Sequence, residues 1–368
     1  MFNSFADRMA QVIVDYSTRV QPNEKVAILS NPAGIPLIES VHDAVLRAGG
    51  HPMVQVNLPS LTERFLRHAN DAQLDFLDPR ALPLYEQADV LINIYAPTNP
   101  KSLSNADPQK QARSQAAQRP VVDTYFRRFG QGLMRFCVCA WPTESGAQEA
   151  EMGVYEYSQF VHDACGLSQP DPIAYWQDFR AKQTQIAEWL KGKKHARVVG
   201  PGIDLSFDFA DRVWISCHGE YNYPDGEIFT GPIESTVKGH VEFSYPTVYG
   251  GHEVDGVKFT FKDGVVVEAS AAKNEEYLLS QLNLDEGARR LGEFAIGTNF
   301  FIQKFTGNTL FDEKIGGTIH MAVGRSIPQS LGVNMSQIHW DMVHGMQDGG
   351  EIYIDGELIY KSGEFLLT

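Results

Sequence analysis

The stretch "KVAILS" (25–30) is an apolar run with the length of a buried β-strand. The helical pattern "PLIESVHDAVLRAGG" (36–50) follows it, and a second strand pattern, "PMVQVNL" (52–58), comes directly afterwards. Two further runs, "ADVLINIYA" (88–96) and "RFCVCAWP" (135–142), repeat the strand pattern with helical segments between them. Because strands that alternate with helices form parallel sheets, the sequence predicts an α/β N-terminal domain with a doubly wound, mostly parallel sheet.

The pattern changes after a long helical stretch that we expect over residues 172–196. From Arg197 onward the chain contains short strand patterns, and Asp263–Gly264 and Asp355–Gly356 are typical of hairpin turns. One helical segment, roughly 274–292, interrupts these strands. The second half is therefore expected to be an α+β domain rich in β-strands.

The chain has 368 residues, which is enough for two domains of ordinary size. We expect the α/β domain over residues 1–190 and the β-rich domain, which would carry catalysis, over residues 191–368. The turn after the first strand, "SNPAGIP" (30–36), has neither the glycine-rich dinucleotide fingerprint nor a Walker lysine. A scaffold or substrate-covering role is therefore expected for the first domain, not nucleotide binding.

Composition limits the classes of partner. The net charge of −15 argues against a surface for nucleic acid or for an anionic membrane. The N-terminus lacks the apolar core of a signal peptide, and no window approaches 18 uninterrupted apolar residues. The four cysteines form no Cys-x-x-Cys pair and are expected to be buried thiols. The sequence predicts a cytoplasmic protein that acts on small molecules or peptides.

The segment "QIHWDMV" (337–343) places two titratable residues in a run that otherwise resembles a buried strand. With a strand period of two, His339 and Asp341 project from one face, whereas Trp340 is expected to pack in the core on the other. Burying a polar group without a partner costs roughly 2–7 kcal/mol. A metal ion, a proton relay or a mutual hydrogen bond would each satisfy the pair.

Three more polar residues lie in turn or strand segments of the same half. Glu227 lies in "YPDGEIFTGP", where glycine and proline restrict the backbone. Glu293 lies in "GEFAIGTN", where its apolar neighbours indicate a carboxylate that points into the interior. His320 lies on the short apolar strand "GGTIHMAVG". Glu227 alone would more often be an exposed turn glutamate, and His320 alone a satisfied core histidine.

Taken together, these residues indicate a metal centre. Two imidazoles and three carboxylates suit Zn²⁺, Co²⁺ or Mn²⁺ better than a thiolate site or an all-oxygen calcium site. A bridging carboxylate would let the set hold two ions ~3.5–4 Å apart, and such ions favour hydrolysis because they activate water and polarise a carbonyl. The residues of this predicted two-metal site are Glu227, Glu293, His320, His339 and Asp341.

Four segments in this half, "PDGEIFTGP", "GEFAIGTN", "GTIHMAVG" and "IHWDMV", resemble the signature segments of the M29 aminopeptidases, the aminopeptidase T and aminopeptidase S type. The resemblance extends to "YSTRVQPNEKVAI" and "NPKSLSNADPQKQ" and so covers nearly the whole chain. It implies a two-metal exopeptidase that removes N-terminal residues from short peptides, and a homodimer. The family's metal positions fall on the five candidates, with Glu293 as the bridging ligand and catalytic residue.

One segment departs from the family pattern. The family carries a tyrosine seven residues after the first ligand histidine, and this chain has Ile327 there, in "HMAVGRSIP". That tyrosine is expected to hydrogen-bond the tetrahedral intermediate, and loss of one such donor lowers kcat by ~10²–10³ in oxyanion holes. Arg325 and Tyr249 are the candidates to replace it.

Two other functions are compatible with parts of the pattern. His320, His339 and Asp341 form the 2-His-1-carboxylate set of a mononuclear Fe(II) oxygenase. A ring-cleaving dioxygenase of dihydroxypyridines resembles the family in fold, although such a site would not need Glu227 and Glu293. The second alternative, motivated by Ile327, is a metal-retaining homologue of low activity that binds peptides.

Overall fold

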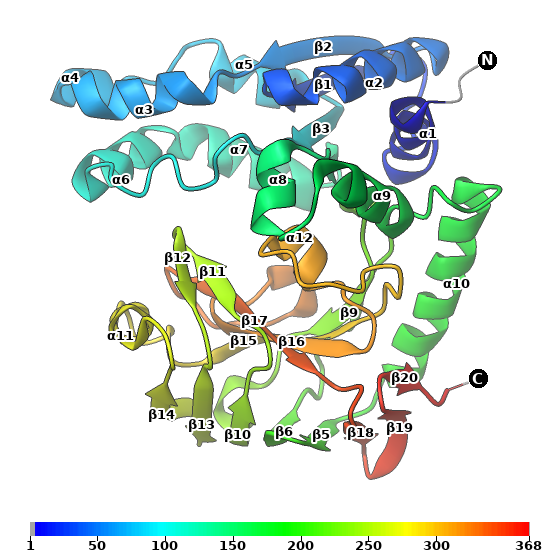
Figure 1. Cartoon of the computed structure of the whole chain (residues 1–368), viewed down its shortest axis with the longest axis vertical. Helices are drawn as coiled ribbons and strands as arrows, with labels where there is room; N and C mark the ends of the chain where they lie inside the picture. The colour runs from blue at the N-terminus through cyan, green and yellow to red at the C-terminus, as the bar shows by residue number, and fades with distance from the viewer. Residues whose placement is uncertain (1–3, 368) are drawn as a thin grey trace. The chain divides into compact units, whose positions relative to one another are not determined.

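The computed structural model describes residues 4–367, which form two compact units (Figure 1). The first unit ends at Ala174 and also includes the short segment Gly219–Pro224. The second unit comprises Tyr175–His218 and the chain from Asp225 onward. The expected division into domains at residues 1–190 and 191–368 stays a prediction.

A parallel sheet forms the centre of the first unit. Its strand order is β2-β1-β3-β4-β8, and every neighbouring pair is parallel. The α/β class and the doubly wound sheet are therefore confirmed, since each apolar run of the first half became a strand. The strands are β1 (Lys25–Ser30), β2 (His51–Val56), β3 (Val90–Tyr95), β4 (Arg135–Ala140) and β8 (Asn222–Tyr223).

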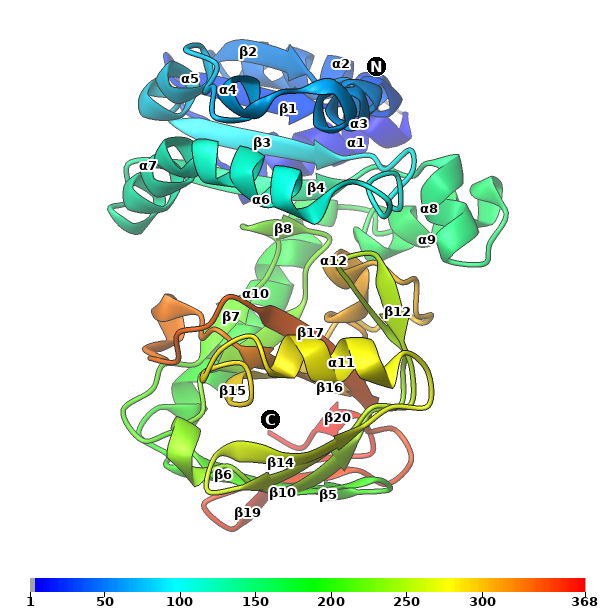
Figure 2. The ribbon, with the colours of Figure 1, turned by 90° about the vertical axis from the view of Figure 1, so that its left-hand side faces the viewer.

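Helices cover both faces of this sheet (Figure 2). Helix α2 contacts β1, β2 and α1, and its buried residues recur at helical spacing along one side. Helices α5 and α7 supply side chains to a cluster around Ala27 and Leu29 of β1. The helical segments of the unit are α1 (Phe5–Val12), η1 (Ile13–Ser17), η2 (Pro32–Gly34), α2 (Ile35–Arg47), α3 (Pro59–His68), α4 (Asp71–Leu74), α5 (Ala81–Gln87), α6 (Pro108–Ala117), α7 (Arg119–Gly130), α8 (Glu144–Glu149) and α9 (Val154–Ala164).

The second unit contains two larger antiparallel sheets (Figure 2). One has eight strands in the order β14-β13-β10-β6-β5-β18-β19-β20. Its hairpin turns include Asp263–Gly264 and Asp355–Gly356, as the sequence predicts. Its strands are β5 (His195–Gly200), β6 (Ile203–Asp208), β10 (Lys238–Glu242), β13 (Lys258–Lys262), β14 (Val265–Ser270), β18 (Glu351–Ile354), β19 (Glu357–Lys361) and β20 (Glu364–Phe365).

The other sheet has five strands in the order β17-β16-β15-β9-β7. The two sheets pack face to face around one apolar core, in which the rings of Phe207 and Phe294 lie 4.9 Å apart. The remaining elements surround these sheets. The five strands and the remaining elements are β7 (Ile215–Cys217), β9 (Glu227–Thr230), β15 (Leu291–Gly297), β16 (Thr318–Gly324), β17 (His339–Gly345), the hairpin β11 (Thr247–Tyr249) and β12 (His252–Val254), α10 (Pro172–Leu190), α11 (Glu275–Leu282), α12 (Thr309–Asp312), η3 (Glu234–Thr236) and η4 (Pro328–Ser330).

The helix expected over 274–292 ends early, at Leu282. A turn follows, in which the Asp285 carboxylate accepts a hydrogen bond from the Ala288 N–H. The residues after it then enter β15, where all seven residues are buried. Within residues 4–367, no helix is long and apolar enough to cross a membrane.

Candidate metal centre

Strand alternation separates the candidate ligands from the core of the second unit. Phe294 of β15, Met321 of β16 and Trp340 of β17 all belong to the core between the two large sheets. The adjacent residues on each strand therefore project from the other face of the five-stranded sheet. The predicted site residues all lie on this face: Glu227 on β9, Glu293 on β15, His320 on β16, and His339 and Asp341 on β17.

The register of the sheet places these residues side by side. Ala322 of β16 pairs with Glu293 on one neighbouring strand and with Asp341 on the other. Gly324, two residues further along β16, pairs with His339 of β17. Because alanine and glycine are small, they leave space between the carboxylates and the imidazoles. The structure therefore brings all five predicted residues together.

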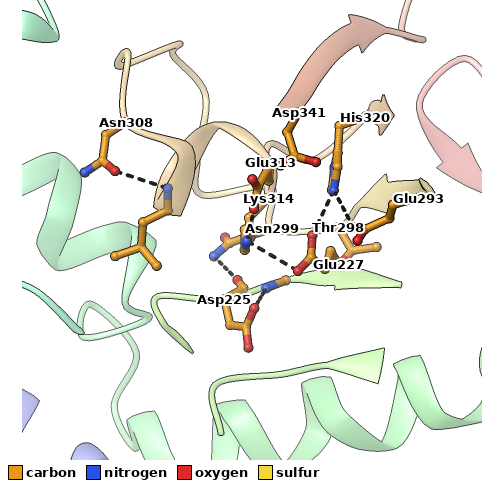
Figure 3. A network of polar contacts seen from close by, with 12 residues as sticks. Asp225, Glu227, Glu293, Thr298, Asn299, Asn308, Glu313, Lys314, His320 and Asp341 are labelled. Carbon is orange, nitrogen blue, oxygen red and sulfur yellow. Dashed lines mark hydrogen bonds and ion pairs between the residues drawn. The ribbon is translucent and has the colours of Figure 1, made fainter. Parts of the chain in front are cut away.

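Alternating contacts link the polar side chains (Figure 3). His320 Nε2 lies 3.2 Å from Glu227 Oε2 and 3.3 Å from Glu293 Oε1. His339 Nε2 lies 3.8 Å from Glu293 Oε2 and 3.3 Å from Asp341 Oδ2. The two oxygens of Glu293 thus face different histidines, which is the arrangement that a bridging carboxylate requires.

A backbone carbonyl fixes the orientation of the His339 ring. Its Nδ1 lies 2.7 Å from the carbonyl oxygen of Arg325, which can only accept a hydrogen bond. In the neutral imidazole Nδ1 therefore carries the proton, which leaves the Nε2 lone pair directed toward Glu293 and Asp341. A histidine ligand held in one tautomer by a backbone carbonyl is a common feature of protein metal sites.

Two residues that the sequence interpretation missed belong to the same cluster. Glu313, directly after α12, offers an oxygen within 4.8 Å of ligand atoms of Glu227 and His320. Lys314 Nζ lies 2.5 Å from Glu313 Oε2 and 3.3 Å from Glu227 Oε1, and its side chain is 2% exposed. The signal in the sequence was a run of three charged residues, Asp312, Glu313 and Lys314, between the apolar residues of "LFDEKIGGTI".

The electrostatics of the cluster are those of tightly coupled charges in a buried site. Burial raises the pKa of Glu227, but Lys314 and His320 outweigh it and hold this pKa at about 2. Burial lowers the pKa of His339, but Asp341 and Glu293 outweigh it and raise this pKa to about 10. Burial is the largest contribution to the raised pKa of Glu293. Without a metal ion, the cluster therefore favours protonated histidines beside the ionised carboxylates of Glu227 and Asp341.

The donor set fits divalent metal ions. In the neutral form that metal binding requires, the Nε2 lone pairs of His320 and His339 would each face two carboxylate oxygens, with no proton between them. A metal cation bound among these atoms would take the place of the Nε2 protons that the metal-free histidines carry. The mixture of imidazole nitrogen and carboxylate oxygen is the set that Zn²⁺, Co²⁺ and Mn²⁺ accept.

Comparison with known proteins identifies the family of this chain. The family described as "Thermophilic metalloprotease (M29)" matches residues 2–365. The chain belongs to the M29 family. The sequence-based prediction of an M29 metallopeptidase is thereby confirmed.

Several proteins resemble this M29 chain. Aminopeptidase 2 of Geobacillus stearothermophilus is 27% identical over 98% of this chain and 97% of that protein. Aminopeptidase T of Thermus aquaticus is 29% identical over 71% of each. The structure of wild-type AmpT from Thermus thermophilus covers 99% of both chains with a TM-score of 0.87 and 22% identity. A 2,5-dihydroxypyridine dioxygenase from Pseudomonas putida KT2440 covers 100% of this chain and 99% of its own with a TM-score of 0.61 and 13% identity. At these identities the two solved structures show the fold alone.

Ile327, where the M29 pattern has a tyrosine, packs against a small apolar cluster that includes Phe229 and Ala295. Both of these residues lie two positions after a candidate ligand, Glu227 or Glu293, so the cluster shares the face of the site. Of the two candidates to replace the missing hydroxyl, Arg325 donates a hydrogen bond from its Nε to the Ser336 carbonyl oxygen.

Tyr249, the other candidate to replace the hydroxyl, stacks on Trp340 with ring centroids 5.0 Å apart. Trp340 is 1% exposed and donates a hydrogen bond from Nε1 to Thr247 Oγ1. The prediction that Trp340 is a core residue is therefore correct. A small hollow also lies beside the site, and its lining includes Thr247, Phe305, Glu313 and Asp341.

Proposed function

We propose that this M29 metalloprotease is an aminopeptidase that removes N-terminal residues from short peptides with the help of two divalent ions. The relatives named aminopeptidase support the reaction type. The observation that carries the two-ion proposal is the orientation of Glu293, whose Oε1 lies toward His320 and whose Oε2 lies toward His339.

In this proposal the ligands form two sets that share Glu293. We call the set of Glu227, Glu293 and His320 the His320 position, and the set of Glu293, His339 and Asp341 the His339 position. Zn²⁺, Co²⁺ or Mn²⁺ bound there would supply a water of lowered pKa and would polarise the scissile carbonyl. The chain's own residues hold the geometry and carry the protons.

Glu293 is the residue that we assign to proton transfer. It is 5% exposed and its two oxygens face His320 and His339, so it would lie beside a water that the bound ions supply. It would accept a proton from the water and return it to the amine nitrogen. The Arg325 carbonyl would meanwhile keep His339 in its ligand tautomer.

An aminopeptidase acts on peptides with a free N-terminus, and the negative charge beside this site offers an explanation for that preference. The hollow beside the site contains the carboxylates of Glu313 and Asp341, next to the apolar ring of Phe305. Carboxylates bind an ammonium group by charge-assisted hydrogen bonds. A peptide with a free amine would therefore be preferred over one whose amine is acetylated.

The test is to load the purified protein with Zn²⁺, Co²⁺, Mn²⁺ or Fe²⁺ and to measure hydrolysis of leucyl p-nitroanilide and of its N-acetyl derivative. We expect hydrolysis of the free-amine substrate, a loss of kcat in Glu293→Gln, and unchanged activity in the surface variant Glu276→Gln. Absence of hydrolysis with every metal would contradict the proposal. One Fe²⁺ per chain with oxygen uptake on a dihydroxypyridine would instead support the ring-cleaving alternative.

The predicted location in the cytoplasm and the predicted homodimer are also part of this proposal. The described cysteines, Cys137, Cys139, Cys165 and Cys217, are all buried and form no disulfide, which supports the cytoplasmic prediction. The homodimer implied by the family stays a prediction, which light scattering on the purified protein tests directly. A monomeric mass at assay concentration would contradict it.

A further inference from the structure

The buried ammonium of Lys314 is a cation that the protein itself places in the candidate metal centre. Its Nζ lies between Glu227 Oε1, at 3.3 Å, and Glu313 Oε2, at 2.5 Å. The backbone of Lys314 is also fixed, because its carbonyl oxygen accepts a hydrogen bond from the Asn299 N–H at 2.9 Å. Figure 3 shows Lys314 on the Glu227 side of the cluster, away from Asp341.

This placement is asymmetric with respect to the two proposed ion positions. At the His320 position, Glu227 has one oxygen facing His320 Nε2 and the other paired with Lys314. At the His339 position, Asp341 and His339 face each other, and neither forms an ion pair with a lysine or arginine among residues 4–367. An ion at the His320 position must therefore share a ligand with an ammonium group.

The total charge also weakens the binding of the second ion relative to the first, at whichever position it binds. With every carboxylate ionised, Lys314 reduces the formal charge of the cluster from −4 to −3. After one divalent ion binds, −1 remains to attract the next. Charges about 4 Å apart in a partly buried site interact by several kcal/mol, so this difference affects affinity strongly. The four carboxylates are those of Glu227, Glu293, Glu313 and Asp341.

We propose that Lys314 makes the two ion positions unequal, so that the His339 position fills first and the His320 position binds its ion more weakly. This inference rests on the proposed two-ion function and deepens it by assigning an order of binding. Lys314 acts as a positioning residue that holds Glu227 and Glu313 in the metal-free protein. It competes with the second ion for the same carboxylates.

Titration of the metal-free, full-length protein with Co²⁺ tests the proposal by calorimetry and visible absorption. The wild type should show two binding events whose Kd values differ by at least about tenfold. Lys314→Met should tighten the weaker event by at least about tenfold, because Glu313 and both oxygens of Glu227 become available. Lys314→Arg keeps the charge and should keep the weak event, and the exposed control Lys262→Met should match the wild type.

Two ligand variants test the order without altering Lys314, in case Lys314→Met does not fold. Glu227→Gln should abolish the weaker event and leave the tighter one, whereas His339→Gln should abolish the tighter one. Two equal events in the wild type would overturn the proposal, as would a weaker event left unchanged by a folded Lys314→Met. A failed peptidase assay is a separate result, because these titrations contain no peptide.

Discussion

The Nδ1 atom of His339 lies 2.7 Å from the carbonyl oxygen of Arg325, and this contact sets which ring nitrogen of His339 faces the candidate metal centre. Arg325 follows the glycine at the end of β16, and its own N–H donates to the Ile338 carbonyl oxygen at 2.7 Å. The histidine and the carbonyl that orients it are therefore tied together by the backbone on both sides. A change that moves the carbonyl should alter metal binding without removing a ligand.

Gly292→Ala is that change. A Cβ at this position would lie 2.4 Å from the Gly324 carbonyl oxygen and 2.6 Å from that of Arg325, so the carbonyls must shift. We expect a loss of metal affinity of roughly 10–100-fold, as for other changes to the partner of a ligand histidine. The matched control is Gly153→Ala, whose Cβ would meet no atom within 4 Å. Unchanged Co²⁺ affinity in a folded Gly292→Ala would contradict the role of the Arg325 carbonyl.

Ala322→Leu should fill the space between the ligands. Ala322 is fully buried and pairs with both Glu293 and Asp341 on the face of the site, so a larger side chain there displaces their carboxylates. We expect a large loss of bound metal together with about 1–3 kcal/mol of destabilisation from overpacking. Met321→Leu, on the core face of the same strand, should keep the metal content. Metal analysis after dialysis separates these outcomes, and full metal content in a folded Ala322→Leu would argue against this location of the site.

Ile327→Tyr should raise kcat if the family's hydroxyl is what this chain lacks. The residue packs beside Phe229 and Ala295 on the face of the candidate ligands, so a tyrosine there would project its ring over that face. The gain could reach ~10²–10³, the cost of removing one oxyanion donor elsewhere. Ile327→Phe is the control, because it adds the ring without the hydroxyl. Equal activity of the two variants in the p-nitroanilide assay would refute the hydrogen-bonding explanation.

His344 should make the stability of the fold sensitive to acid. Burial lowers its pKa below the ordinary value of 6.5, although its Nδ1 contacts the Glu242 carbonyl oxygen at 2.7 Å. The folded state therefore favours the neutral ring. Stability from this group is complete above about pH 6.5 and is lost as the pH falls from there through the folded pKa, because the unfolded chain binds the proton more readily.

His344→Gln should accordingly lose less stability than the wild type between pH 6.5 and pH 5. Urea unfolding at a series of pH values measures the difference. Parallel pH profiles for the two proteins would show that His344 does not contribute.

Much of the fold could be predicted because it depends on local pattern. The apolar runs "KVAILS" and "ADVLINIYA" became the neighbouring strands β1 and β3. The helix expected to reach residue 292 was the main error, since its apolar residues also fit the turn and the buried strand β15. Both faces of a fully buried strand are apolar, so its sequence lacks the alternation of apolar and polar residues that would distinguish it from a helix.

The sequence by itself determined the strand face of His320, His339 and Asp341, because strand alternation is a property of the local backbone. It also determined membership of the M29 family through motifs that lie in a fixed order. Only the tertiary structure decided that the two oxygens of Glu293 face different histidines, since this depends on the pairing of β15, β16 and β17. Glu313 and Lys314 entered the site in the same way. They lie outside those strands, and the fold of the chain between β15 and β16 alone brings the ammonium of Lys314 against Glu227.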